Sequence, residues 1–119
     1  MPVVGLGGFF WRAQDPAALK SWYAEHLGVG PGPGECFWQP EPGPMVFEPF
    51  KATTDYFAAE KAFMLNLRVT DLDSLCEQLN AAGIAVETRA EWNTPETGRF
   101  ARIHDPEGNP IELWEAPAS

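Results

Sequence analysis

The chain has 119 residues, enough for one domain with its own core, and 45% of them are hydrophobic and 21% charged. That composition excludes an intrinsically disordered chain, and the sequence holds no apolar run long enough to cross a membrane. A net charge of −9 argues against nucleic acid as a partner, because phosphate binding needs a basic surface. The N-terminal residues lack a basic region and a signal-like apolar core, so we expect a cytoplasmic protein.

The first half of the chain begins with an aromatic-rich stretch and then carries a clear helix start. Asp15 followed by Pro16 is typical of a helix N-terminus, and Gly28 is typical of its end. A Pro- and Gly-rich loop follows. The predicted elements are a strand at 6–14, a helix at 17–27, a hairpin of strands at 35–39 and 45–50, and a connector at 51–61 with a short helical turn at 55–59.

The second half shows the same signals more clearly. Leu72, Leu75 and Leu79 fall on one face of a helix that Gly83 ends. A tight turn at 105–110 separates the last two strands. The predicted elements are a strand at 62–70, a helix at 71–82, a strand at 84–89, a loop at 91–98, a strand at 99–104 and a closing strand at 111–115.

The two halves resemble each other in sequence. Residues 8–15 are echoed by 64–71, and residues 39–48 are echoed by 105–114. Each half has the predicted order β-α-β-β-β. A duplicated unit predicts two similar half-domains around a pseudo-two-fold axis, with a cleft where they meet.

Alternation along each strand assigns its side chains to two faces. In the second half, the apolar positions form one face, which we expect to pack under the helix: Phe63, Leu65, Leu67, Val69, Ala101, Ile103, Ile111 and Leu113. The opposite face mixes polar and aromatic groups, as a small-molecule pocket requires. In both halves, the side chains placed there are Phe10, Arg12, Met64, Asn66, Arg68, Phe100, Arg102, His104, Glu112 and Trp114. Trp92 lies in a loop, where it could cover the cleft or form a subunit contact.

Three segments, 15–28, 69–83 and most specifically 105–115, make the chain similar to the vicinal oxygen chelate superfamily of glyoxalase-like, bleomycin-resistance and extradiol-dioxygenase proteins. The resemblance implies an α+β fold in which two βαβββ modules are related by a pseudo-two-fold axis, with curved mixed sheets around a central cleft and helices outside. It also implies a homodimer. The implied organisation is a single glyoxalase-like domain at 1–119, with module one at about 5–50, the connector at 51–61 and module two at about 62–116.

Enzymes of this superfamily hold a divalent metal in the cleft, and the resemblance locates the four ligand positions. They are Gly8, Val46, Met64 and Glu112. Only Glu112 keeps a suitable donor, because glycine and valine offer none and a thioether is too soft for a hard ion. We therefore expect no cofactor. A metal stays possible if His104 lies across the hairpin from Glu112 and Glu48 completes the set.

Two functions follow from the resemblance. The first is a binding protein of the bleomycin-resistance type, which sequesters or senses a small aromatic or cationic compound without a metal. The alternative is a glyoxalase-like lyase, isomerase or dioxygenase acting on a small carbonyl compound, with Glu112 as base or metal ligand and His104 as its catalytic partner. The candidate ligand-binding residues are Phe10, Arg12, Trp38, Glu48, Met64, Asn66, Arg68, Arg102 and Trp114.

Two of these candidates, Arg12 and Arg68, occupy equivalent positions in the two halves. They could hold an anionic group of a ligand. The alternative is that they neutralise Glu48 and Glu112 across the cleft, which burial of those acids would require.

Overall fold

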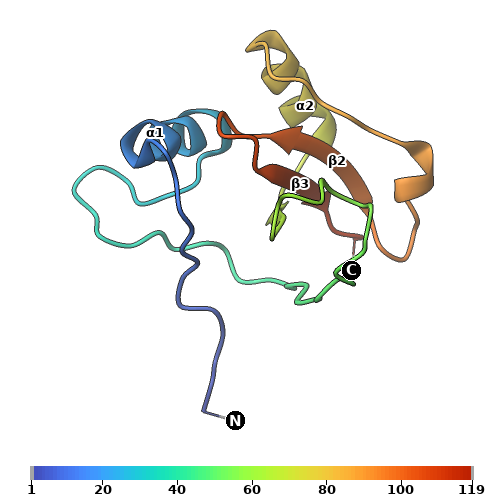
Figure 1. Cartoon of the computed structure of the whole chain (residues 1–119), viewed down its shortest axis with the longest axis horizontal. Coiled ribbons are helices and arrows are strands. Elements are labelled where there is room, and N and C mark those ends of the chain that lie inside the picture. The colour runs from blue at the N-terminus through green and yellow to red at the C-terminus, as the bar shows by residue number, and fades with distance from the viewer. Residues whose placement is uncertain (1, 119) are drawn as a thin grey trace.

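The second half of the chain builds the sheet of this protein, and the first half contributes one helix and long extended segments (Figure 1). The computed structural model describes residues 2–118. No helix within that range has both the length and the apolar character needed to span a bilayer. In chain order the elements are α1 (Pro16–Leu27), β1 (Leu65–Arg68), α2 (Leu72–Ala81), the 3-10 helix η1 (Ala90–Trp92), β2 (Arg99–His104) and β3 (Pro110–Glu115).

The three strands form a mixed sheet in the order β1-β3-β2. β3 runs parallel to β1 and antiparallel to β2. Its Glu112 lies between Asn66 of β1 and Arg102 of β2. Glu87 extends the sheet beyond β2 through a single bridge to Arg102, so the predicted strand at 84–89 is reduced to one paired residue.

One face of this sheet carries the hydrophobic core, as the alternation predicts. Ala101, Ile103, Ile111 and Leu113 are fully buried, together with Leu72 and Leu79 of α2. Leu65, Leu67 and Val69 pack against the same cluster. Burying each large aliphatic side chain contributes roughly 1.5–3 kcal/mol, so this face fixes the sheet against α2.

Both helices begin and end where the sequence predicts. The Asp15 carboxylate accepts from the backbone N–H of Ala18 at 3.1 Å, and Asp71 caps α2 in the same way through Ser74 at 3.3 Å. Gly28 ends α1 in a left-handed conformation with φ of 65°. The N-terminal caps therefore repeat in the two halves of the chain, whereas the C-terminal caps differ, because α2 ends at Ala82 with φ of −86°.

The turn between β2 and β3 holds the first half of the chain against the second. The buried Asp105 carboxylate accepts from the hydroxyl of Tyr23 in α1 at 2.7 Å. The Glu107 carboxylate accepts from the backbone N–H groups of Gln14 and Asp15 at 2.7 and 2.9 Å. Burial, followed by the hydrogen bond and charge of Asp105, raises the pKa of Tyr23 well above its usual value.

The strands predicted for the first half do not form in the isolated chain. Residues 6–14, 35–39 and 45–50 contain no strand residue, and residues 55–59 contain bends and a turn but no helix. A helix satisfies its hydrogen bonds internally, whereas a strand needs a neighbouring strand. Figure 1 shows the blue and cyan segments as coil without arrows. Within residues 2–118 a second, symmetry-related sheet is absent, so the pseudo-two-fold axis stays a prediction.

The close approach of the 93–98 loop to the end of β3 can be tested by substitution. Gly98 has φ of 102°, and an added Cβ would collide with the backbone carbonyl oxygen of Glu115. Gly83 is also left-handed, with φ of 82°, but an added Cβ would meet nothing within 4 Å. We expect Gly83→Ala to lower the free energy of unfolding, measured in urea, by about 1 kcal/mol. Gly98→Ala should lower it by at least about 2 kcal/mol more. Equal costs would show that the loop is not held against β3.

Candidate functional site

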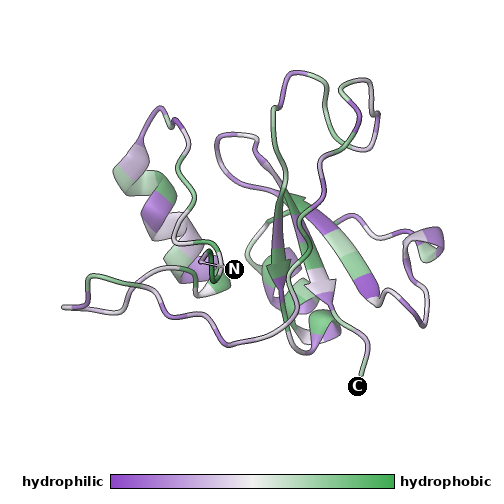
Figure 2. Ribbon diagram, turned by 90° about the horizontal axis from the view of Figure 1, so that it is seen from below, coloured by the Kyte–Doolittle hydropathy of each residue, from purple (hydrophilic) through white to green (hydrophobic). Residues whose placement is uncertain are grey.

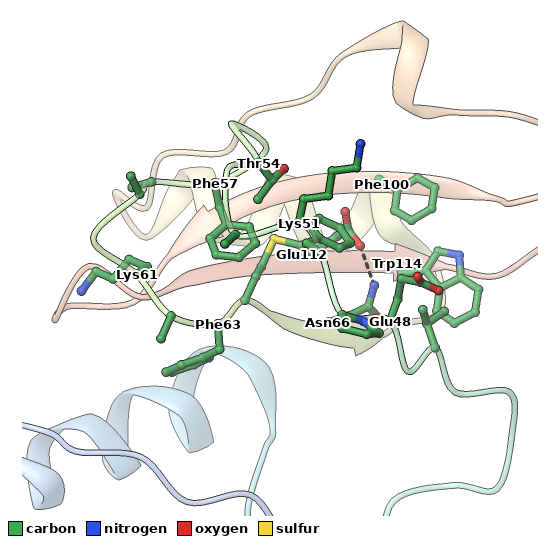
Figure 3. Close-up of a pocket in the computed structure, with 18 of the residues that line it drawn as sticks. Glu48, Lys51, Thr54, Phe57, Lys61, Phe63, Asn66, Phe100, Glu112 and Trp114 are labelled. Atoms are coloured by element: carbon green, nitrogen blue, oxygen red, sulfur yellow. Dashed lines mark hydrogen bonds between the residues drawn. The ribbon is translucent and has the colours of Figure 1, made fainter.

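A cavity of about 850 Å³ lies on the face of the sheet opposite α2 (Figure 3). Its floor is formed by β1, β2 and β3, and the segment 46–64 encloses it. We call this hollow the central cavity. Its apolar walls include five aromatic side chains, which are Phe50, Phe57, Phe63, Phe100 and Trp114. A mostly apolar hollow with a few fixed polar groups is typical of a small-molecule site.

Phe100 and Trp114 form a flat aromatic wall of the central cavity. The two residues are directly opposite each other on β2 and β3, and their ring planes differ by only 12°, with centroids 6.5 Å apart. Figure 3 shows the rings side by side. The Trp114 indole N–H donates to the Thr97 carbonyl at 2.7 Å, which fixes the ring orientation. We call this pair the aromatic platform.

Glu112 is the most buried charged group of the cavity, at 9% exposed. Its Oε2 accepts from the Tyr56 hydroxyl at 2.6 Å, and its Oε1 accepts from the Asn66 side-chain amide at 2.7 Å (Figure 3 draws the second bond). Both carboxylate oxygens therefore have a donor, and both donors are neutral. Among the ion pairs found in residues 2–118, none involves Glu112.

Arg102 is the cross-strand neighbour of Glu112, yet it is occupied elsewhere. Its guanidinium donates to the Tyr56 backbone carbonyl at 3.1 Å and lies over the Tyr56 ring at 4.8 Å and the Trp92 ring at 5.6 Å. This cation–π stack places Tyr56 beside Glu112. It also accounts for the position of Trp92, the loop tryptophan, whose ring contacts Arg102 of the sheet. Burial is the largest cause that raises the pKa of Tyr56 to about 12, followed by its hydrogen bond to Glu112.

The candidate residues predicted from the sequence separate into three groups in space. Those that line the central cavity are Glu48, Met64, Asn66, Glu112 and Trp114. Trp38 and Arg68 line an adjoining groove between residues 38–49 and β1. There the Arg68 guanidinium donates to the carbonyls of Glu41 and Pro44 at 2.5 and 2.7 Å, so it holds the loop rather than Glu48 or Glu112.

The remaining candidates lie outside both hollows. Phe10 is 94% exposed, Arg12 is exposed, and Arg102 is covered by Tyr56. The prediction that Phe10 and Arg68 converge with Glu112 on one hollow is wrong in this structure, because the segment carrying Phe10 joins no sheet.

The prediction that His104 lies across the hairpin from Glu112 is also wrong. In the β2–β3 register His104 is paired with Pro110, and Glu112 is paired with Arg102. His104 is also exposed. The residues present do not fit a divalent metal, because Gly8, Val46 and Met64 supply no hard donor. Within residues 2–118, three or more His, Cys, Asp or Glu side chains nowhere cluster in a way that could hold an ion.

Two residues of this site, Tyr56 and Phe100, have weak signals in the sequence. Tyr56 lies in the connector, where no periodicity indicates which way a side chain points. The only available signal was a Tyr-Phe pair in an otherwise polar segment. Phe100 was placed on the correct face by alternation, but only its position opposite Trp114 reveals the aromatic platform.

Comparison with known proteins identifies the family of this chain. The family model described as "Glyoxalase-like domain" matches residues 8–114, so the chain belongs to this family, within the vicinal oxygen chelate superfamily. No curated protein matches the chain. Among solved structures it is similar to TnmS3, an antibiotic binding protein from Streptomyces sp. CB03234, with 26% identity, 98% of each chain covered and a TM-score of 0.63. It is also similar to a glyoxalase/bleomycin resistance protein from the same strain, with 40% identity over 45% of this chain and 46% of that chain and a TM-score of 0.39.

The titration of the two tyrosines tests the hydrogen bond between Tyr56 and Glu112. A raised pKa means that folding favours the neutral phenol, so this stabilisation is complete below the ordinary pKa of about 10 and is lost as the pH rises through about 12 for Tyr56. We expect tyrosinate absorbance to show no ionisation near pH 10 in the folded protein. Glu112→Gln should lower the pKa of Tyr56, because it removes the negative charge beside the hydroxyl. A tyrosine that titrates normally in the folded wild type would contradict the site.

Proposed function

We propose that this protein binds a small planar aromatic compound in the central cavity and thereby sequesters or senses it. The aromatic platform carries this proposal. Two nearly parallel rings on neighbouring strands line the cavity, and a planar ring that stacks on either of them gains about 0.5–1.5 kcal/mol beyond the area it buries.

Similarity to TnmS3 supports an antibiotic-like ligand. That protein is described as antibiotic binding, and the similarity covers 98% of both chains. A cavity of about 850 Å³ is large enough for a drug-sized molecule, which typically occupies a pocket of about 300–1,000 Å³.

The enzymatic alternative has less support from this geometry. Both oxygens of Glu112 accept bonds from Tyr56 and Asn66, and His104 is not positioned to assist them. Acid–base catalysis by this pair would need both groups within reach of one substrate, and of the two only Glu112 lines the cavity. We therefore propose binding rather than turnover.

Binding of planar probes tests the proposed function. Aminoacridine and anthraquinone sulfonate are tricyclic planar compounds of opposite charge, and we expect at least one of them to quench the tryptophan fluorescence saturably. Phe100→Leu keeps apolar bulk but removes half of the platform, so it should weaken binding about tenfold. Phe37→Leu, at an exposed residue that lines neither hollow, is the matched control and should change nothing. Wild-type protein that binds neither probe would contradict the proposal.

We also propose that the protein acts as a homodimer. The chain exposes 9001 Å², whereas a folded monomer of 13.1 kDa exposes about 6,400 Å². The excess of about 2,600 Å² per chain is on the scale of obligate dimer interfaces. Much of it is apolar and lies in the first half, where Val4 is 100%, Phe10 94% and Phe47 79% exposed. Figure 2 shows green, hydrophobic stretches along these extended segments.

Oligomeric mass tests the dimer. We expect light scattering to give twice 13.1 kDa for the wild type. Phe10→Glu adds a charge to a side chain that is already solvated in the single chain, so it should dissociate or destabilise only a dimer that buries Phe10. The control, Gln78→Glu on the exposed side of α2, should leave the mass unchanged. A wild-type monomer that is stably folded at micromolar concentration would contradict the dimer.

A further inference from the structure

We propose that Tyr56 and Glu112 form an exchangeable pair that selects planar ligands carrying a positively charged nitrogen. In the free protein the Tyr56 hydroxyl occupies the Glu112 carboxylate, and in the complex an N–H of the ligand replaces it. This inference rests on the proposed function and adds the chemical class of the ligand.

The first observation is that Glu112 is a buried carboxylate with only neutral partners. Tyr56 and Asn66 satisfy its two oxygens but bring no compensating charge. Arg102, the nearest cation along the strands, has its guanidinium against the Tyr56 carbonyl and the rings of Tyr56 and Trp92. A buried carboxylate gains more from a cationic donor than from a neutral one, because Coulomb attraction is added to the hydrogen bond.

The second observation is the charge distribution of the cavity. Three carboxylates line it, on Glu48, Glu96 and Glu112. Neither of its two lysines neutralises Glu112. The Lys61 ammonium donates to the Glu107 carbonyl at 3.2 Å, and Figure 3 shows the Lys51 ammonium pointing away from Glu112. The cavity therefore favours a cation close to Glu112.

The third observation is that contacts with Arg102 and with neighbouring aromatic rings hold Tyr56 in place, and no strand ladder does. Tyr56 belongs to the connector, which has no strand partners in the described chain, and its ring packs edge-on against Phe50 and Trp92. Glu112 and Trp114 are two residues apart on the same face of β3. A ring that stacks on the aromatic platform thus has one edge on the side of Glu112, whose carboxylate lines the cavity and accepts the Tyr56 hydroxyl.

Affinities for the two planar probes test the exchange. We expect the wild type to bind aminoacridine, which is a cation at neutral pH, about tenfold more tightly than anthraquinone sulfonate. Glu112→Gln should remove this preference by weakening aminoacridine alone. Tyr56→Phe should strengthen aminoacridine binding several-fold, because the competing hydroxyl is gone. Glu96→Gln makes the same charge change elsewhere on the wall and should have less than about a twofold effect.

Several results would overturn the exchange. Equal losses in Glu112→Gln and Glu96→Gln would show a general charge effect instead of a specific contact. A weaker aminoacridine complex in Tyr56→Phe would make Tyr56 a ligand contact. If both probes bind the wild type equally, the proposed selectivity is wrong while the proposed function stands. If neither probe binds, the selectivity and the proposed function are both wrong. Glu112→Asp, which keeps the charge, should retain part of the preference and serves as a second variant if Glu112→Gln unfolds.

Discussion

The arrangement of this chain depends on one buried carboxylate, that of Asp105. It is 4% exposed and accepts four hydrogen bonds, from the Tyr23 hydroxyl, the Asn109 side-chain amide and the backbone N–H groups of Glu107 and Asn109. One group therefore closes the β2–β3 turn and anchors α1 from the other half of the chain. Losing any donor would leave an unsatisfied lone pair on a buried charge, which costs more than an ordinary hydrogen bond contributes.

The β2–β3 turn, once closed by Asp105, sets the register of β3. That register determines which side chains face the cavity. Because successive side chains on a strand point to opposite faces, Ile111 and Leu113 enter the core while Glu112 and Trp114 face the central cavity. A slip of one residue would exchange the two pairs and would bury a carboxylate under α2. The free-energy cost of burying that carboxylate disfavours the slipped register, so Glu112 and Trp114 stay on the cavity face. The fold and the site are therefore consequences of the same pairing.

The sequence predicts the parts of this structure whose partners are local. Caps at Asp15 and Asp71 locate both helices, and alternation places Glu112 and Trp114 on the cavity face. The first-half strands could not be predicted correctly, because a strand pattern does not reveal whether a neighbour exists in the same chain. His104 was misplaced because the hairpin register depends on the turn geometry. Tyr56 was missed because its position is determined by the stack on Arg102, which has no sequence signature.

The central claim is that a planar ligand rests on the aromatic platform beside Glu112. Heteronuclear NMR of the protein titrated with aminoacridine tests this claim most directly. We expect shifts of the Trp114 indole N–H and the Asn66 side-chain amide, because both residues line the cavity. Trp11 and Trp22, which pack against the core, should not shift. Shifts confined to Trp11 and Trp22, or a saturable complex that leaves Trp114 unchanged, would contradict it.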